Sequence, residues 1–353
     1  MASFAEIKAA HPIEEIVARH VELRPSGSNL VGRCPFHDDQ GRPNLVVFLR
    51  TQTWKCFACG AMGDVLDFVA KAEDVPTAEA ARRIQGMRQV AHASLPPIAE
   101  VSRATDEGVD SVYQALISHL SLSEKHAAAL RRRGLSPEAI REAGYRSLPL
   151  DGRERVVDDL LHQGARLEGV PGFARPRQGG SWRLYGQPGL LIPVRDPQGR
   201  ILGCQVRSDR PSGNRYRWLS TPDTDRRVGG ASSGSPCHVA GRRFLGRRPM
   251  VWITEGPLKA DVTAHRLSAP VLGVAGVANW RKAIEVIKKI QPQRVIVAFD
   301  QDERPETRQA VERNLAEFRE ALLSLKVRVQ TASWGEGKGI DDALTLGHSI
   351  AVC

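Results

Sequence analysis

The stretch that decides the fold of this chain is Met250-Val-Trp-Ile-Thr-Glu-Gly-Pro-Leu-Lys-Ala-Asp261. Its pattern is typical of a short buried strand, a turn with Glu255 at its tip, and a helix. The pattern recurs in Arg294-Val-Ile-Val-Ala-Phe-Asp300-Gln-Asp302. Both apolar runs have the length and β-branched content of buried parallel strands, and carboxylates follow each run. Ligands bind at that edge of an open α/β sheet, so three carboxylates there predict a site for a hard divalent cation.

The C-terminal part of the chain continues this alternation of strand and helix, which predicts an α/β domain with a mainly parallel sheet. We expect strands near 250–254, 270–274, 294–299 and 326–331, and helices over 257–267, 279–290 and about 305–324.

Two short motifs near the N-terminus predict a metal site. Cys34-Pro-Phe-His37 and Cys56-Phe-Ala-Cys59 flank a predicted hairpin of apolar runs. Together they supply three thiolates and one imidazole, a tetrahedral set that satisfies Zn²⁺ and leaves no open position. The zinc is therefore predicted to be structural. The other three cysteines are scattered, which favours a reducing compartment over a disulfide framework.

Size and charge narrow the class of protein. The 353 residues are enough for two or three domains, and 50 Lys+Arg against 40 Asp+Glu give a net charge of +10. The excess is mostly arginine, which suits phosphate recognition, although an arginine-rich genome would have the same effect. There is no signal-peptide pattern at the N-terminus and no apolar run long enough for a membrane span. We therefore expect a cytoplasmic protein without a membrane partner.

The middle of the chain predicts a basic subdomain. Runs at 189–195 and 200–207 predict a hairpin around the turn 196–199. The segment 215–220 then places aromatic residues between arginines, which suits a surface for phosphates and bases, although each side chain taken alone is better explained as a surface charge or a packing aromatic. Arg131-Arg-Arg133 is interpreted as a solvated helix end, with contact to a template backbone as the alternative. The Gly/Ser/Arg-rich residues 226–248 are interpreted as a flexible connection.

These motifs together resemble a known family. Cys34-Pro-Phe-His37 with Trp54-Lys-Cys-Phe-Ala-Cys-Gly60 resembles the zinc-binding domain of bacterial DnaG-type primases. Residues 189–222 are similar to the subdomain that precedes the catalytic domain in that family. The Glu255-Gly256 and Asp300-x-Asp302 motifs resemble the Toprim fold of primases, topoisomerases and some nucleases. We therefore expect a zinc ribbon with helices at 1–90, a linker at 91–110, a mixed α+β basic subdomain at 111–247 and a Toprim-like α/β domain at 248–353.

The resemblance also implies roles for individual residues. Glu255, Asp300 and Asp302 would hold the catalytic Mg²⁺ or Mn²⁺, with Asp341 as a further acidic residue of the site. Lys259 stands where the family has an acidic residue; its amine either contacts the triphosphate or points away. The residues that would bind nucleic acid are Trp54, Lys55, Arg207 and Arg217.

The function implied is that of a DNA primase, which synthesises short primers on single-stranded DNA from nucleoside triphosphates. A replicative helicase would be its partner at the replication fork, in the nucleoid. The departures at Lys259, Gln301 and Pro305 favour a primase of a phage, plasmid or integrative element. The usual C-terminal helicase-binding domain has no counterpart, so either the sequence is truncated or the helicase is recruited differently. Two alternatives remain: a Toprim nuclease or strand breaker, and a non-catalytic module that binds single-stranded DNA.

Overall fold

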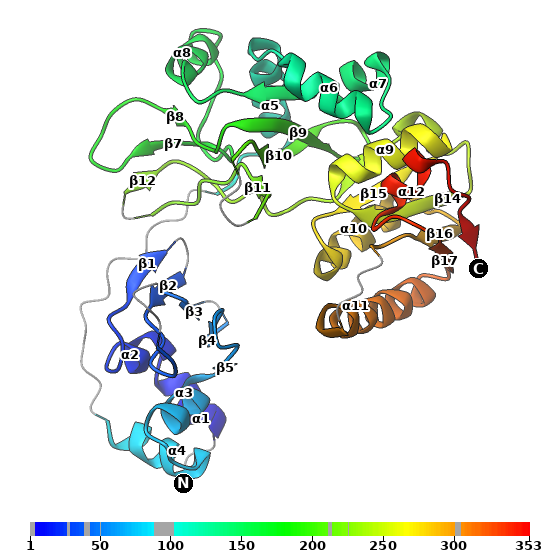
Figure 1. Cartoon of the computed structure of the whole chain (residues 1–353). Coiled ribbons are helices and arrows are strands. Elements are labelled where there is room, and N and C mark those ends of the chain that lie inside the picture. The colour runs from blue at the N-terminus through cyan, green and yellow to red at the C-terminus, as the bar shows by residue number, and fades with distance from the viewer. Residues whose placement is uncertain are drawn as a thin grey trace. The chain divides into compact units, whose positions relative to one another are not determined.

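The computed structural model describes residues 4–26, 29–38, 43–49, 51–87, 102–210, 214–224, 226–300 and 305–353. They form two compact units, one of residues 1–101 with 176–180 and 222–228, the other of residues 102–175, 181–221 and 229–353 (Figure 1). The predicted boundary at 247/248 falls inside the second unit, and most of the predicted linker lies outside the described residues. The four-part division therefore stays a prediction.

The first unit is an antiparallel sheet of order β1-β2-β3-β4-β5 with short helices. The predicted hairpin is confirmed as β3 and β4. Asp64 caps α3 by accepting the N–H groups of Leu66 and Asp67, while the Asp67 carboxylate accepts the Asp64 N–H. The elements are α1 (Phe4–Ala10), α2 (Ile13–Val17), β1 (Arg24–Ser26), β2 (Asn29–Gly32), β3 (Leu45–Phe48), β4 (Thr53–Cys56), β5 (Met62–Gly63), α3 (Val65–Ala72) and α4 (Thr77–Gly86), with β12 (Arg227–Val228) in one of the short added segments.

The N-terminal half of the second unit is a sheet of order β11-β10-β9-β6 with helices around it. The predicted hairpin at 189–207 is confirmed as β9 and β10, which pair antiparallel. The elements are α5 (Asp106–His119), α6 (Glu124–Arg132), α7 (Pro137–Ala143), β6 (Arg146–Leu148), α8 (Arg153–His162), β7 (Phe173–Pro176), β8 (Arg183–Leu184), β9 (Gly189–Arg195), β10 (Ile201–Ser208) and β11 (Tyr216–Trp218).

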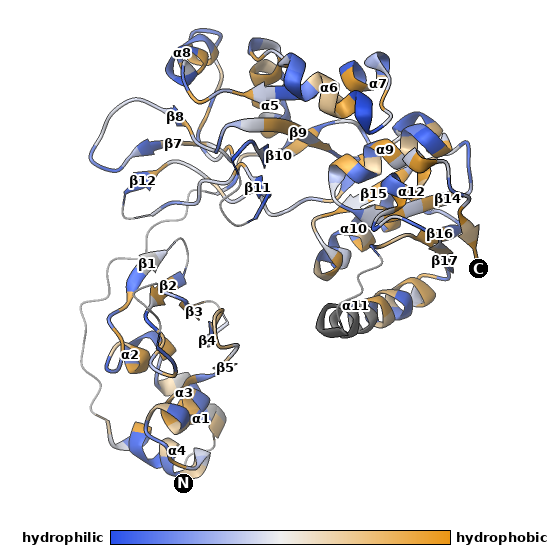
Figure 2. Ribbon diagram, viewed as in Figure 1, coloured by the Kyte–Doolittle hydropathy of each residue, from blue (hydrophilic) through white to orange (hydrophobic). Residues whose placement is uncertain are grey.

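Strand β9 is buried on both of its faces, and its middle is hydrophobic (Figure 2). Leu191 and Val206 face the core that includes residues of α5. Leu190 and Ile192 face the other way and pack in a cluster with Leu258 of α9. This second cluster fixes the sheet against the helix that follows Glu255, so the two halves of the unit share a core.

The C-terminal half is a six-stranded sheet of order β13-β15-β14-β16-β17-β18. The four central strands are parallel and the two edge strands are antiparallel, so the predicted fold class is confirmed. The elements are β13 (His238–Ala240), β14 (Met250–Glu255), α9 (Pro257–Leu267), β15 (Val271–Val274), α10 (Trp280–Ile290), β16 (Arg294–Val297), α11 (Pro305–Ser324), β17 (Arg328–Ser333), α12 (Ile340–Leu346), β18 (Ala351–Val352) and two short 3₁₀ helices, Arg242–Phe244 and Val277–Asn279.

The interpretation of 226–248 as a flexible connection is wrong. His238, Val239 and Ala240 form β13, which pairs with β15 and is buried. The strand is only three residues long and lies in a polar, glycine-rich context, so its apolar signal was too short to recognise.

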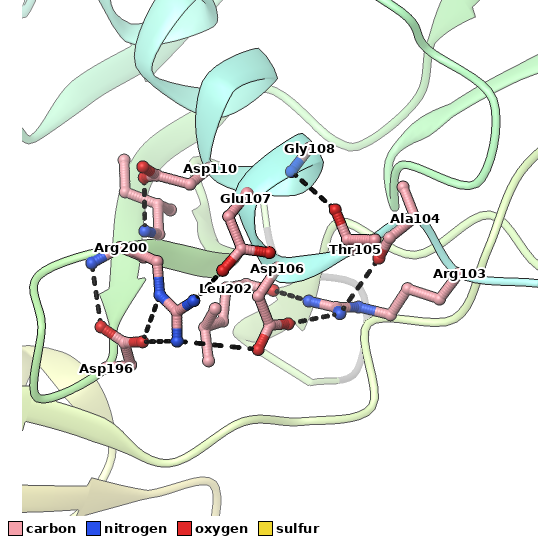
Figure 3. Close-up of polar contacts among 11 residues, drawn as sticks. Arg103, Ala104, Thr105, Asp106, Glu107, Gly108, Asp110, Asp196, Arg200 and Leu202 are labelled. Atoms are coloured by element: carbon pink, nitrogen blue, oxygen red, sulfur yellow. Dashed lines mark hydrogen bonds and ion pairs between the residues drawn. The ribbon is translucent and has the colours of Figure 1, made fainter.

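A polar network anchors the start of the second unit to the β9–β10 hairpin (Figure 3). Arg103 donates to the carbonyl of Leu202 at 2.8 Å, and the Asp110 carboxylate accepts the N–H of the first residue of β10 at 2.7 Å. Arg200 binds Asp196 across the turn at 2.8 Å. These contacts fix the turn end of the β9–β10 hairpin. The residues of β10 that pair with β11 lie toward the other end of the strand. Over the described ranges, no helix combines the length and apolar character needed to cross a membrane.

Candidate metal centre and acidic pocket

Three cysteines and one histidine of the first unit form the predicted zinc cluster. The Sγ atoms of Cys34 and Cys59 are 3.9 Å apart, and Cys56 Sγ is 4.0 Å from His37 Nδ1. All four donor atoms lie within 4.8 Å of one another. Zn–S bonds of about 2.3 Å in a tetrahedron place sulfurs about 3.8 Å apart, so donor set and spacing both fit Zn²⁺. The predicted ligand set of a structural zinc site is thus brought together.

The backbone around Cys56 prepares that thiol for a metal. The N–H groups of Ala58 and Cys59 both donate to Cys56 Sγ at 3.4 Å. Burial opposes ionisation of Cys56, but these N–H groups lower the pKa of its thiol overall. Burial raises the pKa of Cys34 to about 12. The cluster therefore needs a cation to hold all its sulfurs as thiolates, and metal binding is expected to release protons.

The predicted nucleic-acid contact of Trp54 is wrong. Its side chain is 1% exposed and its Nε1–H donates to the Asp64 carbonyl at 3.0 Å. The ring packs against Phe36 and Phe68, with centroids 5.1 and 5.3 Å away. An enclosed ring is not available to stack on a base. Because polar residues and a zinc-ligand motif surround Trp54 in the sequence, its neighbours did not indicate that the ring would be buried.

The residues next to Trp54 point outward and form an exposed face of the ribbon. Phe57 is 63% exposed and Met62 is 59% exposed, and Lys55 lies with its Nζ 5.3 Å from the Phe57 ring centre. Lys55 pairs with Met62 across β4 and β5, so both side chains share one face. Sequence reasoning missed Phe57, although the alternation that buries Trp54 would have placed its odd-numbered neighbours outside.

In the second unit, Glu255 and Asp300 lie at the carboxyl ends of two parallel strands, the kind of sheet edge that the sequence predicted, and the structure shows that these strands are neighbours. Glu255 ends β14 and Asp300 follows β16, and the Asp300 N–H donates to Glu255 Oε1 at 3.4 Å. Gly256 makes the turn between strand and helix with a φ of +83°, which only glycine adopts readily. Lys259 lies one turn into α9 and its Nζ binds both Asp300 oxygens, with Oδ2 at 2.5 Å. Asp302 lies outside the described residues.

Asp341 joins this cluster from the start of α12. It is 2% exposed, and its Oδ2 accepts from Arg133 at 2.8 Å. Its buried Oδ1 has no hydrogen-bond partner among the residues that the structure describes. A Cβ atom at Gly339 would lie 2.7 Å from Asp341 Oδ1, 2.9 Å from Lys259 Nζ and 3.1 Å from Asp300 Oδ1. The absence of a side chain at 339 therefore leaves room in which these three groups approach one another.

The electrostatics of the acidic edge suit a cation. Burial raises the pKa of Glu255, and the neighbouring Asp300 charge adds to this while Lys259 opposes it. Burial also raises the pKa of Asp341, opposed by Lys259 and Arg133. The chemistry of the donor set and the unpartnered Asp341 oxygen fit a divalent cation held by oxygens.

The interpretation of Arg133 as part of a solvated helix end is wrong, because it pairs with the buried Asp341. The two residues are 208 positions apart, so no local pattern in the sequence connects them.

A pocket of about 330 Å³ joins the acidic edge to the β10–β11 ribbon. Gln205 pairs with Trp218 and Arg207 with Tyr216, so these four side chains share one strand face. Arg217 pairs with Val206 and therefore lies on the opposite face. Of the two arginines predicted to bind nucleic acid, Arg207 thus shares the strand face of Gln205, Tyr216 and Trp218 and Arg217 does not, and the binding roles of both stay predictions. The residues lining the pocket are Gln205, Tyr216, Trp218, Glu255, Gly256, Leu258, Lys259, Ala275, Gly276 and Asp300.

Asp261, the last residue of the stretch 250–261, does not line this pocket. Its carboxylate accepts from the Tyr145 hydroxyl at 2.5 Å and from His238 Nε2 at 3.0 Å. His238 Nδ1 in turn accepts the backbone N–H of Arg195 at 3.0 Å, so the ring proton is on Nε2. Asp261 thus ties α9 to β9 and to the Tyr145 segment behind the acidic edge.

The architecture defines a class of protein, namely a zinc ribbon combined with an α/β domain whose acidic sheet edge faces a strand ribbon. Comparison with known proteins narrows this class. Residues 1–95 match the CHC2 zinc finger family, and residues 247–349 match a domain of unknown function, DUF3854.

A DNA primase of Aquifex aeolicus is 29% identical over 206 residues, which cover 56% of this chain and 39% of that protein. A DNA primase of Deinococcus radiodurans is 26% identical over 356 residues, 96% of this chain and 57% of that protein. The crystal structure of the Aquifex aeolicus primase, with its zinc-binding and RNA polymerase domains, superposes with a TM-score of 0.53 at 22% identity, covering 99% of this chain and 87% of that one. The chain is therefore related to the DnaG-type primases, with a CHC2 zinc-binding domain and the fold of the primase catalytic core.

Proposed function

We propose that this chain is a DNA primase that synthesises short primers on single-stranded DNA from nucleoside triphosphates. The observation that carries the proposal is the pocket in which Glu255, Lys259 and Asp300 face the aromatic side chains of Tyr216 and Trp218. A polymerising site needs this combination, because charge must be neutralised at the triphosphate while a base is held beside it. The relatives named DNA primases support the assignment, although this chain spans only 39% and 57% of their lengths.

The reaction proposed is nucleotidyl transfer. A 3′-hydroxyl oxygen attacks the α-phosphorus of a nucleoside triphosphate, a new P–O bond forms, and the bond to pyrophosphate breaks. Mg²⁺ or Mn²⁺ held by Glu255, Asp300 and Asp341 would neutralise the charge that builds on the phosphorus oxygens. The residues of the chain contribute position and charge. Tyr216 and Trp218 line the pocket and would hold the base, while the Lys259 ammonium, which also lines it, would contact the phosphates.

The exposed face of the zinc ribbon supports a DNA partner. Lys55 supplies charge for a phosphate, while Phe57 supplies an exposed ring on which a base can stack. The net charge of +10 also favours binding to the phosphates of DNA. We extend the proposal to a replicative helicase as partner, to action at the replication fork in the nucleoid, and to origin in a phage, plasmid or integrative element. Lys259 and the match to DUF3854 support the last point, because both separate the catalytic domain from the usual primase pattern.

The test is primer synthesis on single-stranded DNA with nucleoside triphosphates and Mg²⁺ or Mn²⁺. Asp300→Asn removes a carboxylate from the acidic edge, and we expect at least a 100-fold loss of product. Glu320→Gln is the matched control, since Glu320 is exposed on α11 and should prime normally. Full activity of Asp300→Asn would refute the proposal. Binding of DNA that survives a chelator, without synthesis under either metal, would favour a non-catalytic binding module.

A second candidate, a strand breaker, is favoured by one observation. Tyr216 is 39% exposed and lines the acidic pocket, whereas Tyr113 and Tyr145 are fully buried. A topoisomerase-like reaction would join the Tyr216 oxygen to a DNA phosphorus and release a DNA hydroxyl. Tyr216→Phe should leave priming within a few-fold of the wild type. Metal-dependent relaxation of supercoiled DNA that disappears in Tyr216→Phe would support the strand breaker instead.

A further inference from the structure

Lys259 occupies the interior of the acidic cluster and does not point away from it. Its Nζ binds both oxygens of Asp300. A Cβ atom at Gly339 would lie 2.9 Å from that Nζ and 2.7 Å from Asp341 Oδ1, so the ammonium also lies close to Asp341. The side chain is 24% exposed and that of Asp300 is 14% exposed. The lysine is therefore partly enclosed among carboxylates, and its ammonium lies against their negative charge.

The position of Lys259 also matters for how many cations the edge can hold. An ammonium that binds both oxygens of Asp300 occupies one lone pair on each, so Asp300 can still help to hold one metal ion but cannot bridge to a second. It also repels a divalent ion placed a few ångströms away, because screening is weak at a partly buried site. Among the carboxylates that the structure describes at this edge, the other available oxygens belong to Glu255 and to Oδ1 of Asp341. Arg133 already neutralises the other Asp341 oxygen.

We propose that the Lys259 ammonium is a built-in cation of the acidic edge, and that this chain therefore binds one divalent ion fewer than the same edge would bind without the lysine. The inference rests on the proposed function, because it concerns the same site. The ammonium holds the Asp300 carboxylate in place without a metal and keeps a donor at the pocket, where a triphosphate oxygen would lie. The site is then less dependent on a second divalent ion than one made of carboxylates alone.

The test counts bound Mn²⁺ in the full zinc-loaded chain, using the electron paramagnetic resonance signal of free Mn²⁺ during titration. Lys259→Met removes the ammonium, and Lys259→Asp replaces it with a further oxygen ligand. Lys288→Met is the matched control, because Lys288 is exposed on α10. We expect both variants at 259 to bind one more Mn²⁺ per chain than the wild type and the control, and Lys259→Asp to bind it at least tenfold more tightly than Lys259→Met.

Equal Mn²⁺ stoichiometry in wild type, Lys259→Met and Lys259→Asp would overturn the inference. Melting temperatures with and without Mn²⁺ check that each variant is folded, and Lys259→Met alone carries the test if Lys259→Asp does not fold. Primer synthesis is measured in parallel. An extra Mn²⁺ in the variants with no synthesis by the wild type would support the inference and refute the proposed function. Synthesis by the wild type, with no extra Mn²⁺ bound by the variants, would support the proposed function and refute the inference.

Discussion

Removal of one hydroxyl group behind the acidic edge should weaken the second unit measurably. Tyr145 is fully buried, and its hydroxyl donates to the Asp261 carboxylate at 2.5 Å. The same carboxylate accepts from His238, and its side chain is 14% exposed. Tyr145→Phe keeps the ring in the cluster with Leu258 and Val262 but leaves one carboxylate oxygen without its donor.

The magnitude follows from the charge on the acceptor. A hydrogen bond to a charged group contributes about 1.5–3 kcal/mol to the free energy of unfolding, against about 0.5–1.5 kcal/mol for a neutral one. Tyr113 provides the neutral comparison, since its buried hydroxyl donates to the Pro171 carbonyl at 2.7 Å. We expect Tyr145→Phe to cost about 2–3 kcal/mol and Tyr113→Phe about 1 kcal/mol. At roughly 2–4 °C per kcal/mol, Tyr145→Phe should lower the melting temperature by about 4–12 °C.

The assay is denaturation of the full zinc-loaded chain by guanidinium, followed by circular dichroism, with thermal melting as a second measurement. The difference between the two variants isolates the charge of the acceptor, because each loses the same hydroxyl from a fully buried ring. A loss below about 0.5 kcal/mol for Tyr145→Phe, or an equal loss in both variants, would refute the reasoning that Asp261 serves as a buried tie.

Three further predictions concern the two sites. Phe57→Ala should weaken binding to single-stranded DNA about tenfold without unfolding the ribbon, as measured by fluorescence anisotropy. Trp54→Ala should instead lower the free energy of unfolding by about 3–5 kcal/mol, as measured by melting. Chelation of zinc, or Cys59→Ser, should abolish the folded signal of the first unit in amide hydrogen exchange and leave the second unit protected. Affinity for Mn²⁺ at the acidic edge should fall as the pH is lowered, beginning above 4.5, because burial raises the pKa of Glu255 and protons then compete with the metal. In isothermal titration Glu255→Gln should lose part of this pH dependence, and an unchanged profile would contradict the assignment.

Much of the architecture followed from local pattern. The strand and helix segments between 250 and 333 were recognisable because each apolar run was long enough to show its period, and the turn at Gly256 had the residue its φ requires. The zinc ligands were recognisable because their spacing alone limits the chemistry. Strand β13 was missed because three residues carry too little periodic signal.

The sequence by itself determined which residues are able to bind metal and that Glu255 and Asp300 would lie at one edge of the sheet, because parallel strands bring their carboxyl ends to one edge. Only the tertiary structure decided where the partners of those groups lie. Arg133 reaches Asp341 across 208 positions, and Lys259 turns into the carboxylates. Such contacts depend on how helices pack against the sheet, and burial then decides which charges must be paired, a quantity that no local stretch of sequence contains.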